Sequence, residues 1–125
     1  MKTYLLLLIA LLAQPVIGAE YTLEKFWASM PTNEKQIGNM HGDIAVSSKN
    51  EVYISVQGGP KAGVQVYDNK GNYLRNVPNA PTDFHGFVIR ETESGEHIYG
   101  PRLGGQNILK LTLAGKTVLD IKPAT

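Results

Sequence analysis

A repeat with a period of 44 residues constrains the fold of this chain more than any other feature of its sequence. His41-Gly42 recurs as His85-Gly86, and three further anchors recur at the same offset. They are Val64-Gln65-Val66-Tyr67 with Ile108-Leu109-Lys110-Leu111, Gly71 with Gly115, and Leu74 with Val118. A repeat of this length is typical of proteins built from stacked supersecondary units. We therefore expect two similar units, at about 41–84 and 85–125.

The offset is not constant inside the unit. Val52-Tyr53 matches Ile98-Tyr99 at 46 positions, so two residues are added near Glu93-Ser94 and two are lost before Ile108. Because changes of length are tolerated mainly in surface loops, both places are expected to be loops.

Each unit contains four short stretches with the composition of β-strands, separated by turn residues. In the stretch EVYISV, Val52, Ile54 and Val56 alternate with Tyr53 and Ser55, so the two sets should face opposite sides of a sheet. The strands expected along the chain are 44–46, 51–56, 64–67, one that begins at 73, 87–90, 96–99, 108–113 and 116–121. Four short antiparallel strands in about 44 residues match one blade of a β-propeller.

The fold class expected is therefore all-β, with about two blades of four antiparallel strands that form part of a six-bladed propeller. A closed propeller has about four to eight blades, so two blades leave strand edges open. Either missing blades in a longer chain or self-association of several copies would close the ring. Tyr21–Trp27 is a candidate for the strand that completes the last blade. An accidental repeat in an eight-stranded β-sandwich is the alternative, since regular strand spacing fits both architectures.

The first residues have the pattern of a cleavable export signal. Lys2 precedes an apolar run, YLLLLIALLA, which is shorter than the roughly 20 residues that a spanning helix needs. Small residues at Gly18-Ala19 predict cleavage between Ala19 and Glu20. The domain organisation expected is a signal peptide at 1–19 and a partial propeller at 20–125, in a secreted or periplasmic protein. A short buried helix or an uncleaved anchor is the alternative reading of the run, but an integral membrane protein is not expected.

Charge and cysteine content exclude several classes. The chain has 12 basic and 11 acidic residues, and loss of Lys2 with the signal leaves a formally neutral domain. A neutral domain lacks the basic surface that usually marks a nucleic-acid-binding protein. Because there is no cysteine, neither a disulfide nor a lipid-modified cysteine can stabilise or anchor the chain.

The segment from His41 to Leu74 resembles the NHL repeat, whose general form is G-I-A-V, a turn, V-Y-V, a loop, and I-x-V-F-D-x-x-G. The chain departs from this form at Ser47 and Val56, which replace aspartates, and at Ala62-Gly63, which replaces Asn-Arg. The second unit matches less closely. The resemblance implies a six-bladed propeller and leaves the activity open, because propellers host unrelated functions.

Four residues are candidates for a functional site. In a propeller, His41 and His85 would begin the innermost strands and face the central channel, where neutral imidazole could hold an ion such as zinc, or calcium if oxygen ligands joined it. The loops 58–63 and 100–106 would open on the same face, and Lys61 and Arg102 in them could bind an anionic group of a substrate. The plainer alternatives are hydrogen bonding of the histidines to loop backbone and solvation of both cations. His97, within a strand next to Tyr99, is expected to lie at the surface or to have a packing role.

The stretch Phe84-His85-Gly86-Phe87-Val88-Ile89 is also similar to the strand-opening histidine motif of peptidyl-α-hydroxyglycine α-amidating lyases. This resemblance implies that His85 is a metal ligand. It fits His41 less well, because aligning Ile44 with the aliphatic position of the motif puts Gly42 in the ligand position. The third ligand and the catalytic tyrosine and arginine of that family have no counterpart that can be placed here.

Three functions follow as hypotheses. The first is an exported binding or scaffold propeller for a small molecule, glycan or protein. The second is a metal-dependent lyase or hydrolase of the amidating-lyase or lactonase type. The third, a lectin assembled from two-blade chains, is disfavoured because the single tryptophan, Trp27, lies outside both repeats.

Overall fold

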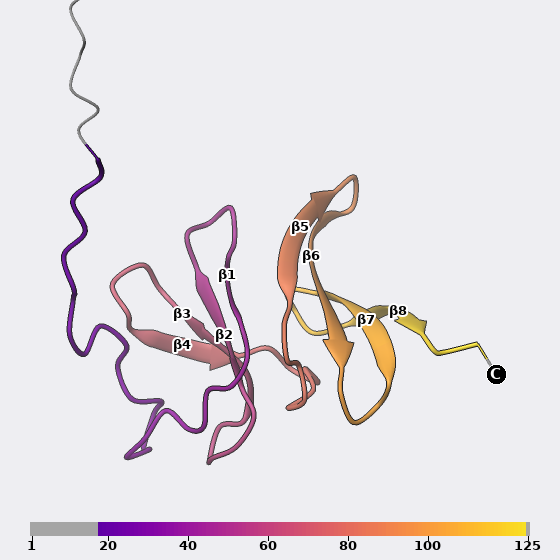
Figure 1. Cartoon of the computed structure of the whole chain (residues 1–125), viewed down its shortest axis with the longest axis horizontal. Helices are drawn as coiled ribbons and strands as arrows, with labels where there is room; N and C mark the ends of the chain where they lie inside the picture. The colour runs from indigo at the N-terminus through magenta and orange to yellow at the C-terminus, as the bar shows by residue number, and fades with distance from the viewer. Residues whose placement is uncertain (1–17, 125) are drawn as a thin grey trace, which may run out of the picture.

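The computed structural model describes residues 18–124, which form two four-stranded antiparallel sheets side by side and contain no helix (Figure 1). The first sheet consists of β1 (Ile44–Val46), β2 (Val52–Val56), β3 (Gly63–Tyr67) and β4 (Tyr73–Asn76). The second consists of β5 (Val88–Thr92), β6 (Gly95–Arg102), β7 (Asn107–Thr112) and β8 (Thr117–Ile121). No helix in this part of the chain is long and apolar enough to cross a membrane.

In both sheets the strands follow one another in sequence order, β1-β2-β3-β4 and β5-β6-β7-β8. This is the all-β arrangement expected from the repeat, and each sheet is consistent with one blade of a propeller. A register shift also recurs, between Val66 and Tyr67 in the first sheet and between Lys110 and Leu111 in the second. These four positions are paired at the offset of 44 residues, so the repeat extends to a local irregularity of the backbone.

The register defines which residues of the two sheets are counterparts. Tyr53 pairs with Ala45 and Val66 in the first sheet, and Tyr99 pairs with Val88 and Lys110 in the second. We call the side of the first sheet that carries the Tyr53 side chain its front face, and the side of the second sheet that carries Tyr99 its front face. In the first sheet it comprises Ala45, Tyr53, Val64, Val66 and Val77; in the second it comprises Val88, Tyr99, Ile108, Lys110 and Ile121.

The main core lies between the front face of the first sheet and the opposite side, or back face, of the second. It joins Tyr53, Val64 and Val66 to a set from the second sheet and the preceding linker. That set is Phe84, Phe87, Ile89, Ile98, Leu109 and Leu111. Two buried or cross-sheet polar contacts reinforce the packing. Ser55 Oγ donates to the carbonyl of Phe84 at 2.7 Å, and Ser48 Oγ donates to Glu96 at 2.8 Å.

A smaller core covers part of the back face of the first sheet. Ile54, Val56 and Tyr67 pack there against Trp27, Ala28 and Ile37 of the segment that precedes β1. Tyr21–Trp27 does not form the strand expected for a last blade. Tyr21, Leu23 and Phe26 are largely exposed, as expected of a segment that is not paired with a strand.

The segment before β1 contacts the first sheet as the linker before β5 contacts the second. Gly71 is so close to the carbonyl of Trp27 that a Cβ would overlap it, and Gly115 is equally close to the carbonyl of Pro78. Farther along, Asn39 forms a bridge with Gly58, as Phe84 does with Arg102. The structural repeat therefore consists of a linker followed by four strands, and it includes residues before His41.

Candidate functional site

The four residues selected from the sequence lie at one end of the two sheets. β1 begins where the antiparallel β2 ends, so His41 and the loop with Lys61 are at the same end of the first sheet. The same relation places His85 beside Arg102, which is the last residue of β6 and not part of a loop as expected for 100–106. We call Arg102 and the turn 103–106 that follows it the Arg102 loop. The bridges of Asn39 with Gly58 and of Phe84 with Arg102 fix both arrangements. We call this the histidine end.

His41 and His85 lie against each other at this end. Their ring centroids are 5.1 Å apart and their planes meet at 83°, an edge-to-face contact. Both residues are exposed to solvent. Side chains from the two sheets thus meet at one point, although the linker and the whole first sheet separate them in sequence.

The two histidines are not structural counterparts. Ala45 corresponds to Val88, so three residues earlier Gly42 corresponds to His85 and His41 precedes that position by one residue. The pairing of His41 with His85 at the sequence offset of 44 therefore does not match the register of the innermost strands. The glycine explains the difference: a Cβ at Gly42 would lie 2.5 Å from Cβ of Ser55, so no side chain fits there.

The loop with Arg102 is organised by a carboxylate. Nε of Arg102 donates to Oδ1 of Asp83 at 2.9 Å, and the backbone N–H groups of Gly104 and Gly105 donate to Oδ2 at 3.0 and 3.3 Å. Burial raises the pKa of Asp83, but the hydrogen bonds and charge of Arg102 and the two amides outweigh it, so that the pKa lies below its usual value. Arg102 is thus engaged in holding its own loop.

Lys61 is placed differently. Its carbonyl accepts hydrogen bonds from Nε2 of Gln65 at 2.9 Å and from Nδ2 of Asn76 at 3.1 Å, which fix the backbone of the loop. Within residues 18–124 its ammonium takes part in no ion pair. Lys61 and Arg102 therefore share an end of the molecule but have different electrostatic surroundings.

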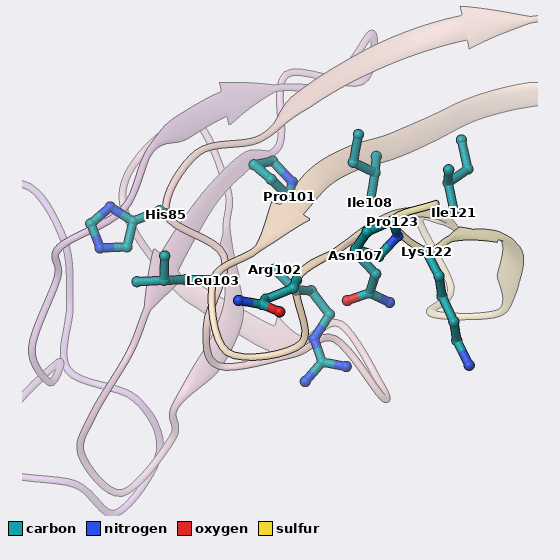
Figure 2. A pocket seen from close by; sticks show the side chains of 10 residues that line it. His85, Pro101, Arg102, Leu103, Asn107, Ile108, Ile121, Lys122 and Pro123 are labelled. Carbon is teal, nitrogen blue, oxygen red and sulfur yellow. The ribbon is translucent and has the colours of Figure 1, made fainter. Parts of the chain in front are cut away.

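A pocket of about 510 Å³ begins at His85 and extends over the second sheet (Figure 2). Its apolar part is formed by Pro101, Ile108 and Ile121, which lie on the front face. Figure 2 shows that Ile108 and Ile121 point to one side of the sheet and that Asn107 and Lys122 point to the other. The pocket therefore lies at the histidine end of the second sheet, next to His85, and its apolar wall belongs to the front face.

Three polar residues of this region were not selected from the sequence. Asp83 holds the Arg102 loop, and Asp43 places Oδ2 3.8 Å from the Cβ position of Gly86, across the contact between the sheets. Asn107 donates to Asp120, while its buried Oδ1 has no hydrogen-bond partner among the described residues. An acidic residue two positions before His85 was a usable signal for Asp83. The other two depend on contacts between strands that a sequence does not display.

The described residues contain no cluster of three or more His, Cys, Asp or Glu side chains close enough to hold one metal ion. His97 lies away from the histidine end, buried in β6, with Nδ1 2.8 Å from the carbonyl of Gly95. Searches with this chain match no family model, no curated protein and no solved structure. The site is therefore interpreted from its own geometry.

Proposed function

We propose that this protein is an exported binding module of the β-propeller type, similar to NHL-repeat propellers, and that the histidine end is its ligand-binding face. The observation that carries the proposal is the contact of His41 with His85, two exposed imidazoles from different sheets with centroids 5.1 Å apart. Exposed polar rings held together at the junction of two sheets are available to a ligand and have no evident packing role. Export is proposed from the apolar run at residues 4–13, which lies outside the described residues.

The chemistry that such a pair favours is coordination by imidazole nitrogen or hydrogen bonding to a small polar ligand. Two imidazoles that share an ion of the zinc type have their nitrogens roughly 3–4.5 Å apart, since each Zn–N bond is about 2 Å. Ring centroids at 5.1 Å in an edge-to-face contact permit this spacing with small rotations of the side chains. An anionic ligand is supported by Lys61 more than by Arg102, whose charge Asp83 already balances.

The alternative, a metal-dependent lyase or hydrolase, has weaker support. A catalytic zinc site usually has three protein ligands, and His41 and His85 supply two. Asp43 follows His41 by two residues, but it forms no three-residue cluster with the histidines. Binding without catalysis accounts for the observed pair with fewer additional groups.

Titration of the exported chain with Zn²⁺, followed by NMR of the histidine ring protons, tests the proposal. We expect the signals of His41 and His85 to shift together, while His97, which is buried in β6, serves as an internal control. His85→Ala should weaken zinc binding by about tenfold or more, since one of two ligands is lost. Equal responses of all three histidines, or no response of the pair, would contradict a site at the histidine end.

A further inference from the structure

The front face of the second sheet is an apolar surface that lacks the cover its counterpart has. Val64 and Val77 in the first sheet are 0% and 3% exposed, whereas their counterparts Ile108 and Ile121 are each 49% exposed. Val88, on the same face, is also exposed. The sheets have the same topology, so the difference comes from what lies against them.

The back faces show the opposite difference. Phe87 and Ile89 in the second sheet are 3% and 8% exposed, because they pack on the first sheet. The register makes Ile44 and Val46 their counterparts, and these are 60% and 57% exposed. The segment with Trp27 covers the part of that face around Tyr67 and leaves Ile44 and Val46 open.

The contact between the two sheets shows how a front face is normally filled. Phe84 and Phe87 insert there beside Val64 and Val77, and Ser55 fixes the carbonyl of Phe84. The corresponding place on the second sheet is the pocket of about 510 Å³ that Pro101, Ile108 and Ile121 line (Figure 2). The pocket therefore lies at the place on the second sheet that corresponds to the seat of the aromatic pair on the first.

We propose that a second copy of this chain docks on the front face of the second sheet. The second copy contributes the back face of its first sheet, which includes Ile44 and Val46. One contact of this kind would cover both exposed apolar surfaces, and it would repeat the internal contact between the sheets. Because the two surfaces differ, the association is head-to-tail, and it closes as a ring when the rotation from copy to copy matches the turn between blades of a propeller. Propellers of about four to eight blades correspond to two to four copies.

Lys110 limits the strength of this contact. It stands where the internal contact has the fully buried Val66, and its ammonium lies 5.4 Å from the centroid of the Tyr99 ring. A lysine in the centre of an interface must bend its charge toward the rim or lose hydration. We therefore expect Lys110→Val to tighten the association, although it removes a charge.

Light scattering of the exported chain during size-exclusion chromatography tests the proposal. The wild type should have the mass of two to four copies, and Ile108→Asp with Ile121→Asp should weaken association by roughly 100-fold or more. Ile44→Asp with Val46→Asp should do the same from the other side. These residues are half exposed in one copy, so each variant should still fold, with an unchanged β-sheet circular dichroism spectrum. Leu74→Asp, an exposed apolar position at the bulge of β4, is the matched control and should not dissociate the oligomer.

Mixing the two double variants gives the sharpest result. Each retains one intact surface, and the two intact surfaces are complementary, so the mixture should form a dimer and nothing larger. The proposal would be overturned by a wild type that is monomeric at tens of micromolar, or by a mixture that remains monomeric. Binding of a small ligand in the pocket without any change of the oligomer's mass would overturn it as well. His41 and His85 belong to one copy, so a dissociated variant should keep the zinc response. If the wild type were oligomeric as expected but its histidines did not respond to zinc, the proposed ligand site would be wrong and the proposed docking would stand.

Discussion

The first and second sheets have the same strand order and the same bulge, yet their equivalent residues lie in opposite environments. The front face of the first sheet is buried against the second sheet, and the front face of the second is open. The back faces differ in the reverse sense. In a repeat protein, the burial of a residue is therefore set by its neighbouring unit as much as by its own unit. Predictions that compare counterpart residues test this directly.

The largest expected effect is at Tyr53, compared with its counterpart Tyr99. Tyr53 is fully buried, and its hydroxyl donates to Glu51 at 2.8 Å and accepts from Arg75 at 3.1 Å. Burial and these contacts with Glu51 raise the pKa of the Tyr53 phenol, so it stays neutral. Tyr53→Ala should lower the free energy of unfolding by about 3–5 kcal/mol, and Tyr99→Ala by about 1 kcal/mol.

Urea denaturation at low micromolar protein concentration measures both values. Repeating it at much higher concentration sharpens the comparison, because the cost of Tyr99→Ala should rise once a second copy covers that face. Equal costs at low concentration would mean that the second sheet does not differ from the first in the way described.

A smaller effect is expected at the glycines where a linker crosses a turn. Gly71 and Gly115 have φ values of +83° and +84°, and an added Cβ would overlap the carbonyl of Trp27 or Pro78. Gly95 has a φ of +100° but open space around it. Gly71→Ala and Gly115→Ala should each cost about 3 kcal/mol, of which left-handed strain accounts for about 1–2 kcal/mol.

Gly95→Ala is the matched control. It introduces left-handed backbone strain without a steric overlap, so it should lower the free energy of unfolding by about 1–2 kcal/mol. Thermal unfolding of the three variants measures the difference. If Gly71→Ala were no more costly than Gly95→Ala, the segment with Trp27 would not lie on the first sheet as the linker lies on the second.

The sequence predicted the fold well because its signals were local and repeated. Alternation in EVYISV placed Tyr53 and Ile54 on opposite sides, and both sides are buried, in different cores. Strand ends were less well predicted: β6 extends to Arg102, whereas 96–99 was expected, because Pro101 and Arg102 pair with Ile108 and Asn107 across the sheet. Such pairing depends on the partner strand and not on local composition.

The candidate site was predicted in part. The strand-opening pattern placed His41 and His85 at one end of the sheets, where their rings are in contact, and Lys61 and Arg102 lie at the same end. The register of His41 could not be predicted, since it depends on how closely Gly42 approaches Ser55. The binding role of all four residues remains a prediction.

The smallest expected effect distinguishes the two loops of the histidine end by pH. Because the pKa of Asp83 is lowered in the folded chain, its contribution to stability is complete above the unfolded value of about 3.9 and is lost as pH falls through the folded value. The Arg102 loop should therefore be unchanged from pH 7 to about 4 and loosen only below that. The loop with Lys61 contains no carboxylate between Gln57 and Gly63, so its own backbone contacts should persist.

Backbone amide NMR across this pH range provides the measurement. The signals of Gly104 and Gly105 should move with a midpoint below about 3.9, since their N–H groups lose a charged acceptor when Asp83 is protonated. Gly59 and Ala62, which share a backbone hydrogen bond of 3.3 Å, should move far less over the same range. Asp83→Asn retains the shape of the side chain but not its charge, so it should abolish the titration of Gly104 and Gly105. A midpoint above 4, or an unchanged titration in Asp83→Asn, would show that Asp83 does not organise this loop. The two loops would then differ in sequence, but neither would depend on a carboxylate for its conformation.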